Sequence, residues 1–538
     1  MNFKKYSWLI VCLFLAAALP FVGQNFLTHR DSGGVIRPTL EAYDVQHYAL
    51  QVVVNDESQS IEGTCTITAI ALMDITTFEC DLDAVFTVHD VSMDNGEALR
   101  FDHKAGVIRA DRAIRKGDEF SVTVGYSGKP VTSAHVPWSG GFVWAKTKTG
   151  EPWIGVACQG EGGDFWWPCK DDPADEPDRG MNIEITARQG LTSLSNGRLE
   201  GVLDNQDGTT TSRWHVSYPI NTYLVTVNIG PYEAIRVPYH GLDGERDYEL
   251  MFWALPEDLD KASSTAQQIP GILGVLGKYF GEYPYLEDKC WFVQTPFLGM
   301  EHQTLVAYGA GFKNNEYGFD TILLHELAHE WWGNKVSVSD WADFWIQEGF
   351  ASYAEALYVE DTLGADAYFA YMSELKARIA NKKALIQGDH VPASVAYHQD
   401  VYQKGAWVLH TLRFLVGDET FFEILHAFCN DPQYTHGNNV NTQDFVSLVE
   451  RKAGKLDWFW KHYLHHAKPP AWVMERQSHG EHEEITLRWL DADITMPFPL
   501  SVGGEMRRLV PKGGRVSLEV PKGAEVVVDP QGWMLTKS

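Results

Sequence analysis

Apolar and polar positions alternate along much of the first half of the chain. The runs at 48–54 and 64–71 alternate or are rich in β-branched residues, and turn residues separate them. Strand-like runs of this kind continue to 247–253, and no long stretch of helical periodicity interrupts them. A long region with this pattern is typical of an all-β fold. We therefore predict an N-terminal β domain over residues 43–255.

The pattern changes at Pro256, where apolar residues begin to recur at helical spacing. The helix-like stretches are 257–280, 319–334, 346–360, 365–381, 402–415, 418–429, 442–453 and 456–467. After Pro469, alternation returns in short runs that are bounded by glycine and proline turns. The chain is therefore predicted to be a multidomain α+β protein, with a mainly helical domain at 256–468 and a small C-terminal β-sandwich at 469–538.

The first residues combine positive charge with an apolar stretch. Lys4 and Lys5 precede residues 6–23, which carry no charge, and this order is typical of a secretory signal peptide. We interpret residues 1–23 as the signal peptide and 24–42 as a linker. An uncleaved membrane anchor is the alternative interpretation. In both cases we expect the protein to be exported, to the periplasm or to the extracellular space.

Composition narrows the possible functions. The 538 residues are too many for a single hydrophobic core, so several domains are expected. A formal charge of −28 argues against nucleic acid as a partner, because its phosphates would be repelled. The seven cysteines include no Cys-x-x-Cys motif, so a cysteine zinc site is not indicated.

Residues 325–329 read His-Glu-Leu-Ala-His within an apolar run that fits a helix. Because an α-helix turns by about 100° per residue, His325 and His329 project from one face and can reach one metal ion. Glu326 lies beside them, where a carboxylate can take a proton from a water that the metal activates. Taken alone, the motif also fits a buried helix with two hydrogen-bonded histidines.

Glu348 adds a third candidate ligand for the metal. It lies in Trp-Ile-Gln-Glu-Gly-Phe, at the start of another helix-like stretch over 345–358. If this helix packs against the first, Glu348 reaches the metal that His325 and His329 hold. Two histidines and one carboxylate leave the fourth tetrahedral position open for water, as in catalytic zinc sites. The pattern therefore favours a zinc hydrolase.

Further short motifs bear on chemistry. Gly299-Met-Glu-His follows a strand-like run, Gln159 precedes a Pro-Cys pair, and Tyr402-Gln-Lys-Gly opens a helix-like stretch. Taken alone, Glu301 is more often a solvated carboxylate, Gln159 a loop amide and Tyr402 a core tyrosine. None of these motifs assigns a function by itself.

Together these motifs resemble the zinc aminopeptidases typified by aminopeptidase N and the leukotriene-hydrolase aminopeptidases, which are gluzincins. The resemblance covers roughly residues 43–500. The family's long zinc motif is matched in full. Its Gly-x-Met-Glu-Asn motif keeps Met300 and Glu301, but Leu298 and His302 replace its first Gly and its Asn, and the sequence leaves the role of His302 open. The resemblance implies a β-saddle, a thermolysin-like mainly helical catalytic domain and then a β-sandwich.

The resemblance also implies roles for the site residues. His325, His329 and Glu348 would hold one zinc ion per chain. Glu326 and Tyr402 would be catalytic, Glu326 as the proton acceptor and Tyr402 as the donor to the oxyanion. The substrate-binding residues would be Gln159, Gly299, Met300 and Glu301.

Within that set, Glu301 and Gln159 would grip the free α-amine, and Met300 would line the pocket for the first side chain. The predicted function is therefore a zinc-dependent aminopeptidase that acts on peptides with a free N-terminus through a metal-activated water. The alternatives are a zinc endopeptidase, an epoxide hydrolase that uses the same zinc, and a non-catalytic peptide-binding protein on the same fold. No nucleic-acid partner is expected, and membrane association is expected only if the N-terminal segment stays uncleaved.

Overall fold

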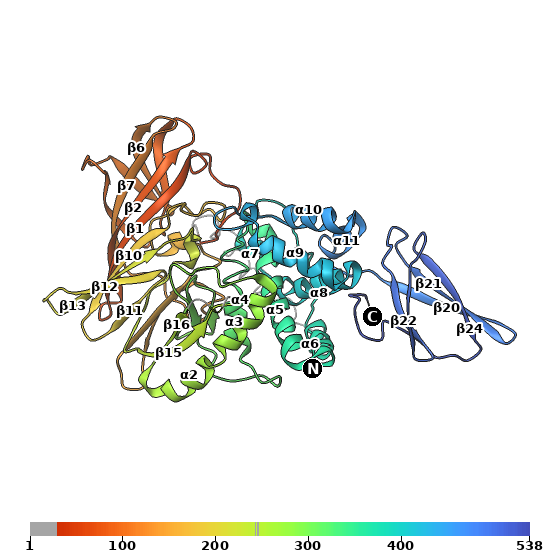
Figure 1. The fold of residues 1–538 in the computed structure, drawn as a ribbon. Coiled ribbons are helices and arrows are strands. Elements are labelled where there is room, and N and C mark those ends of the chain that lie inside the picture. Colours follow the sequence, from red (N-terminus) through yellow and green to blue (C-terminus); the bar gives the residue numbers. More distant parts are fainter. Residues whose placement is uncertain (1–29, 243, 245–246, 538) are drawn as a thin grey trace, which may run out of the picture.

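The structure, a computed structural model, describes residues 30–242, 244 and 247–537. The predicted signal peptide at 1–23 and the first part of the predicted linker lie outside the described residues. N-terminal β-sheets, a helical domain and small C-terminal sheets follow one another along the chain (Figure 1). This order confirms the predicted multidomain α+β fold. Within the described part of the chain, no helix has the length and apolar character that a membrane span needs.

The N-terminal domain is built on a sheet whose strands alternate buried and exposed residues. In order across the sheet, its strands are β12 (Arg198–Asp204), β13 (Thr209–Val216), β10 (Met181–Arg188), β1 (Tyr43–Asn55), β2 (Ser60–Ala71), β7 (Glu119–Gly128) and β4 (Thr87–Met93). Leu50, Val52 and Val54 of β1 are buried, whereas Gln51 and Val53 between them are exposed. This period of two residues is the pattern from which strands were predicted.

Smaller sheets complete this domain and lead to the site. Their strands, in order, are β3 (Ile75–Asp81), β6 (Val107–Ile114) and β5 (Phe101–Lys104), and then β11 (Thr192–Leu194), β14 (Asn228–Gly230), β9 (Pro152–Ala157) and β8 (Gly141–Lys146). The chain leaves β9 into the loop that carries Gln159. The single turn η1 (Gly163–Phe165) follows this loop and packs against another single turn, η2 (Thr222–Leu224).

A mixed sheet joins the β domain to the helical domain. Its order is β15 (Glu233–His240), β16 (Asp247–Ala254), β17 (Trp291–Gln294), β19 (Leu305–Tyr308) and β18 (Gly299–Met300). Because β16 pairs in parallel with β17, the predicted domain boundary after residue 255 falls inside this sheet. Alternation identifies β15 and β16 as strands, but it does not say which sheet a strand joins.

The helical domain packs around α5 (Trp345–Leu363), which is buried along most of its length. The other helices are α2 (Leu259–Ala266), α3 (Ile269–Phe280), α4 (Thr321–Ala328), α6 (Ala365–Ala377), α7 (Ala393–Ala396), α8 (Asp400–Val416), α9 (Asp418–Asn430), α10 (Thr442–Ala453) and α11 (Asp457–Tyr463), with single turns η3 (Pro256–Asp258), η4 (Trp341–Asp343) and η5 (Pro432–Tyr434). Helices α3, α4, α6 and α8 contact α5.

The predicted stretches 365–381 and 456–467 end four residues earlier in the structure, at Ala377 and Tyr463, and two other stretches differ more. The stretch 257–280 is divided into α2 and α3, and Pro270 occupies the first turn of α3, where a proline is tolerated. The stretch 319–334 is shorter, because α4 ends at Ala328 and the chain turns at Gly333, whose φ is 122°. Pro270 therefore marks the start of α3 within a continuous apolar run.

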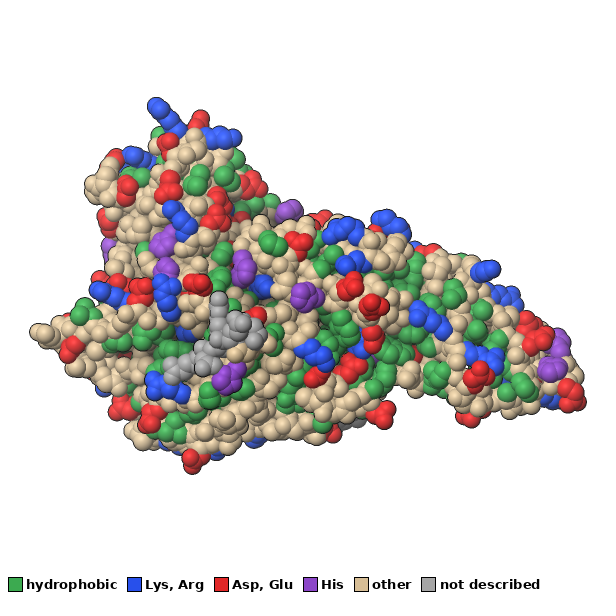
Figure 2. Space-filling view, in the orientation of Figure 1, with side chains coloured by type: hydrophobic (Ala, Val, Ile, Leu, Met, Phe, Trp, Pro, Cys, Tyr) green, Lys and Arg blue, Asp and Glu red, His purple; other side chains and the backbone are tan. Residues whose placement is uncertain are grey.

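The C-terminal segment forms small antiparallel sheets beyond the helices. Their strands, in order, are β20 (Trp472–His479), β21 (His482–Trp489) and β24 (Arg515–Pro521), and then β23 (Glu505–Leu509), β22 (Phe498–Val502) and β25 (Val526–Val528). The rings of Trp489 and Phe498 stack with their centroids 4.8 Å apart and join the two sheets. The sheets extend away from the helices (Figure 1) and form a narrow projection in the space-filling view (Figure 2).

Residues 30–42 were predicted to be part of a linker, but they pack against both large domains. Ser32, Leu40 and Ala42 are buried. The backbone of Ser32 bonds to Gly160 in the N-terminal domain and to Ala393 in the helical domain. No sequence motif marks these contacts, because they join residues that lie far apart along the chain.

Candidate active site

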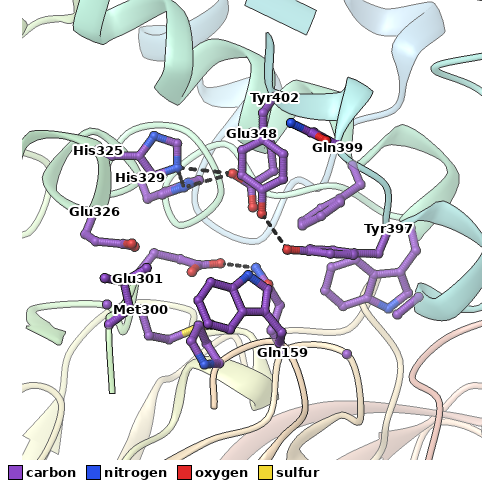
Figure 3. Close-up of a pocket in the computed structure, with 18 of the residues that line it drawn as sticks. Gln159, Met300, Glu301, His325, Glu326, His329, Glu348, Tyr397, Gln399 and Tyr402 are labelled. Atoms are coloured by element: carbon purple, nitrogen blue, oxygen red, sulfur yellow. Dashed lines mark hydrogen bonds and ion pairs between the residues drawn. The ribbon is translucent and has the colours of Figure 1, made fainter. Parts of the chain in front are cut away.

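Helices α4 and α5 bring three possible metal ligands together. His325 lies in the last turn of α4, His329 follows at its C-terminal cap, and Glu348 lies in the first turn of α5. The Nε2 atoms of the two histidines are 3.2 Å apart, and they lie 3.3 Å and 3.4 Å from Oε2 of Glu348. Figure 3 shows the three side chains converging on one point.

This triangle of donor atoms fits a tetrahedral zinc ion. Atoms bound at about 2.0–2.1 Å to such an ion lie about 3.3 Å from one another, and the observed separations of 3.2–3.4 Å agree with that value. Two imidazoles and one carboxylate are also donors that zinc prefers. All three side chains line the same cavity, so the remaining tetrahedral position would face a substrate.

A glycine pair lets α8 approach α5 and complete the site. Gly349, next to Glu348, lies against Gly405 of α8, and a Cβ on either glycine would come within 2.9 Å of the other residue's Cα. This approach places Tyr402 beside His325, with ring centroids 6.0 Å apart. The glycine of the Tyr-x-Lys-Gly motif therefore has a packing reason.

The two imidazoles are oriented through their other ring nitrogen. Nδ1 of His325 lies 2.7 Å from Oε1 of Glu355, and Nδ1 of His329 lies 2.7 Å from the backbone carbonyl of Trp332. When Nδ1 donates in both pairs, each Nε2 keeps its lone pair for the metal. No sequence motif marks either partner, although Glu355 follows Glu348 on the same helix by about two turns.

Glu326 lies beside the metal group, where Gly299 makes room for it. A Cβ at Gly299 would come within 2.7 Å of Oε1 of Glu326. Burial raises the pKa of Glu326 to about 8, and while His325 and His329 oppose this shift, Glu301 adds to it. A carboxyl group with a pKa near neutrality can accept a proton and return it in one catalytic cycle.

A second buried carboxylate, Glu301, is fixed next to the metal group. Its Oε1 accepts hydrogen bonds from Nε2 of Gln159 at 2.5 Å and from the hydroxyl of Tyr223 at 3.1 Å. Its backbone carbonyl accepts a hydrogen bond from the side-chain amide of Asn334 at 2.9 Å. Burial raises the pKa of Glu301. A carboxylate held in a cavity in this way suits a cationic ligand, which would offset its desolvation.

The predicted site residues share a cavity of about 610 Å³ between the N-terminal and helical domains. Gln159 enters from the first domain, and Glu326 and Tyr402 enter from the second (Figure 3). Met300 and Gly299 line the wall beside Glu301. A cavity with apolar walls and a few convergent polar groups is typical of a ligand site.

Comparison with known protein families covers both of these domains. Residues 44–224 match the peptidase M1 N-terminal domain, and residues 277–463 match the peptidase family M1 domain. The chain belongs to peptidase family M1. The matched ranges include the metal group and the residues Gln159, Glu301 and Tyr402.

Curated relatives of this M1 peptidase are longer proteins. Aminopeptidase N of Rattus norvegicus is 26% identical over 297 residues, which are 50% of this chain and 30% of that protein. Leucine aminopeptidase 2 of Vanderwaltozyma polyspora is 25% identical over 458 residues, which are 77% of this chain and 65% of that protein. The chain therefore spans less than two thirds of the length of either relative.

The fold is also similar to that of solved M1 structures. The M1 zinc metallopeptidase of Deinococcus radiodurans aligns with a TM-score of 0.68 at 24% identity, over 82% of this chain and 98% of that chain. A variant of the Deinococcus radiodurans enzyme, solved with a Tyr-Ser-Ala substrate, aligns with a TM-score of 0.67 at 25% identity over the same shares. The order of domains in this M1 peptidase is therefore shared with solved relatives.

His302, at which the M1 chain departs from the Gly-x-Met-Glu-Asn motif, faces away from the cavity. It is fully buried and does not line the cavity. Neither of its ring nitrogens has a hydrogen-bond partner among the residues that the structure describes. Burial lowers the pKa of His302 to about 3, so the imidazole stays neutral near pH 7. The structure therefore supports neither substrate contact nor titration by this residue.

Tyr402 has a neighbour in the M1 site that no sequence motif marks. Its hydroxyl donates to the hydroxyl of Tyr397, 3.1 Å away, and both rings line the cavity. Burial raises the pKa of Tyr402 well above the usual range, so the phenol remains a proton donor. Tyr397 belongs to no recognised motif, and the sequence offered no signal for it.

Proposed function

We propose that this M1 peptidase is a zinc-dependent aminopeptidase that removes the first residue from peptides with a free N-terminus. The position of Glu301 carries the proposal, because Gln159 holds this carboxylate beside the metal-binding group. The names of the relatives aminopeptidase N and leucine aminopeptidase 2 support the same activity. The Tyr-Ser-Ala complex of the Deinococcus radiodurans enzyme supports a peptide as the substrate.

His325, His329 and Glu348 would hold one zinc ion per chain. When bound by these residues, the ion would supply Lewis-acid chemistry, which would polarise the scissile carbonyl and lower the pKa of the attacking water. Within the described part of the chain, the possible metal-binding groups all include His329, which supports a single ion rather than a pair.

Glu301 and Gln159 bind the α-ammonium group of the peptide. The positive charge of that group meets the buried carboxylate, while the amide of Gln159 and the hydroxyl of Tyr223 keep the carboxylate in position. With the amine held there, the first peptide bond lies over the metal group. A longer N-terminal extension would have to enter space that these buried side chains fill. Met300 lines the wall next to the first side chain.

Glu326 and Tyr402 carry out the proton and charge chemistry. Glu326 accepts the proton of the attacking water and then passes it to the leaving amine, a role that typically contributes about 10²–10⁴ in rate. The hydroxyl of Tyr402 donates to the oxyanion that develops on the carbonyl. One donor of this kind is typically worth about 3 kcal/mol at the barrier.

The α-amine provides the direct test of this function. A tripeptide with a free N-terminus should be cleaved after its first residue, and its N-acetylated form should be cleaved at least about a hundredfold more slowly, because acetylation removes the charge that Glu301 binds. Equal rates for the two peptides would identify an endopeptidase. Binding of the free peptide without any cleavage would identify a non-catalytic peptide-binding protein.

We also propose that the protein is exported. Lys4 and Lys5, followed by the uncharged residues 6–23, support this proposal. Expression of the full chain, followed by cell fractionation and N-terminal sequencing, tests it. An exported form that begins near residue 24 is the expected result, and retention of an intact chain in the membrane fraction would favour the anchor alternative. A full-length chain found in the cytoplasm would contradict both.

A further inference from the structure

Residues 30–34, which we call the strap, cross the edge of the active-site cavity and join its two walls. On the side of the N-terminal domain, the backbone N–H of Ser32 donates to the carbonyl of Gly160 at 2.9 Å. The hydroxyl of Ser32 donates to Asp171, also at 2.9 Å. On the side of the helical domain, the carbonyl of Ser32 accepts from the N–H of Ala393 at 2.9 Å. The strap therefore bonds to both domains through one residue.

Contacts on either side of Ser32 fix the path of the strap. The carboxylate of Asp31 accepts hydrogen bonds from the backbone N–H and the hydroxyl of Ser394. The indole N–H of Trp341 donates to the hydroxyl of Ser32 at 3.1 Å. Gly33 has a φ of 78°, and a Cβ there would come within 2.4 Å of the Trp341 ring. The contacts of Asp31, Ser32 and Gly33 thus hold the adjoining residue, Arg30, at the edge of the cavity.

The strap presents Arg30 to the cavity. Nε of Arg30 donates to the buried carboxylate of Asp83 at 2.8 Å, and the guanidinium lies 5.8 Å from the centre of the Phe165 ring. The Arg30 side chain is still 37% exposed. Within the described part of the chain, its two Nη nitrogens make no hydrogen bond. One part of the guanidinium is therefore anchored, and its remaining N–H groups are available to a ligand.

The charge of Arg30 is unusual for this cavity. Among the described residues that line the cavity, Arg30 is the only lysine or arginine. The carboxylates that line it are Asp31, Glu161, Glu301, Glu326 and Glu348. A guanidinium presents paired N–H donors that match the two oxygens of a carboxylate. Arg30 is therefore the cationic side chain in this cavity whose N–H donors match a carboxylate of a substrate.

We propose that Arg30 determines specificity by binding a carboxylate of the peptide substrate. This inference rests on the proposed aminopeptidase function. A cavity of about 610 Å³ holds a peptide of only a few residues. The carboxylate has two possible sources, which are the C-terminus of such a short peptide and an acidic side chain near its N-terminus. In both cases the anchored strap supplies a preorganised cation to the substrate.

Matched peptides distinguish the two sources of the carboxylate. The first pair is Ala-Ala-Ala and its C-terminal amide, and the second pair is Glu-Ala-Ala-amide and Gln-Ala-Ala-amide. The Arg30→Gln variant of the full chain should lower kcat/KM about tenfold or more for the carboxylate-bearing member of one pair, mainly through KM. The neutral member of that pair should change by less than about twofold, because it never contacts the lost charge.

Arg37 offers a matched control outside the cavity. Arg37 lies just after the strap and pairs with Glu79 and Asp81 of β3, but it does not line the cavity. Arg37→Gln should leave the preference for carboxylate over amide unchanged, and Arg30→Lys, which keeps the charge, should restore part of it. If Arg30→Gln lowers kcat/KM selectively for Ala-Ala-Ala, Arg30 binds the C-terminal carboxylate. If it lowers kcat/KM selectively for Glu-Ala-Ala-amide, Arg30 binds the acidic side chain.

If Arg30→Gln lowers kcat/KM equally for all four peptides, or changes it for none of them, the proposal is overturned. If that variant does not fold, the unmodified protein decides: a preference for a carboxylate over its neutral partner supports the proposal, and equal or reversed preference contradicts it. If the unmodified protein cleaves none of the peptides, the proposed function fails. The affinities of the unmodified protein and of Arg30→Gln for the same peptides, measured by calorimetry, then test Arg30 on its own.

Discussion

At the scale of residues, the site depends on buried groups whose neighbours fix their orientation. Glu355 and the carbonyl of Trp332 each lie within hydrogen-bond distance of Nδ1 of one metal-binding histidine, which leaves the Nε2 atom of each imidazole free for the metal. Gln159 and Tyr223 hold the carboxylate of Glu301 in the same way. The chemistry therefore needs each side chain together with the partner that orients it.

Replacing Glu326 tests the proton transfer. Glu326→Ala should lower kcat for a free-amine peptide by about 10²–10⁴, because it removes the carboxylate proposed to accept the proton of the attacking water. Zinc should stay bound, since Glu326 is not one of the three proposed ligands. Peptide hydrolysis and elemental analysis of the same preparation measure both quantities. An unchanged rate would remove Glu326 from the mechanism.

The two neighbouring tyrosines should differ in effect. Tyr402→Phe should lower kcat by about 10²–10³ with little change in KM, because the hydroxyl acts on charge that develops only in the transition state. Tyr397→Phe is the matched control, which removes the hydroxyl that Tyr402 contacts but keeps Tyr402 itself. Its effect on kcat should be smaller. Steady-state kinetics of both variants decide, and a larger loss in Tyr397→Phe would reverse the assignment.

At the scale of elements, the site exists because helices cross closely. Gly349 of α5 and Gly405 of α8 touch through their backbones, which brings Glu348 and Tyr402 into one cavity. Side chains of ordinary size would hold the helix axes about 8–10 Å apart. The contact links the Trp-Ile-Gln-Glu-Gly-Phe motif of α5 to the Tyr-x-Lys-Gly motif of α8.

A methyl group at this crossing should separate the helices. Gly405→Ala should destabilise the protein by about 1–3 kcal/mol, because its Cβ would overlap the backbone of Gly349. It should also lower kcat, since Tyr402 moves with α8. Gly271→Ala on α3 is the matched control: nothing lies within 4 Å of the added Cβ, so stability should stay equal or rise by up to about 1 kcal/mol. Urea midpoints measure the difference, and equal midpoints for the two variants would contradict the packing argument.

The element pattern could be read largely from the sequence. Helices α9 and α10 begin and end within one residue of the predicted stretches 418–429 and 442–453, because apolar spacing and a following turn mark them. The membership of β15 and β16 in the mixed sheet could not be read, because pairing depends on partners that lie far along the chain.

At the scale of the whole molecule, the cavity is shared by two domains and the strap. The pair His325 and His329 could be predicted because helix geometry relates residues four apart. Tyr223 and Arg30 could not be predicted, since Tyr223 reaches Glu301 and Arg30 reaches the cavity from other parts of the chain, and neither belongs to a motif. Contacts of this kind follow from tertiary packing, so local sequence carries no signal for them.

If two imidazoles and one carboxylate hold a single catalytic zinc ion, activity should follow the amount of zinc bound in a metal titration. Metal-free protein, prepared with a chelator, should be inactive toward a free-amine peptide. Stepwise addition of zinc should raise the rate in proportion until one equivalent per chain is bound, after which the rate should stay constant. Full activity in protein that contains no stoichiometric metal would rule out a catalytic zinc ion at these three residues.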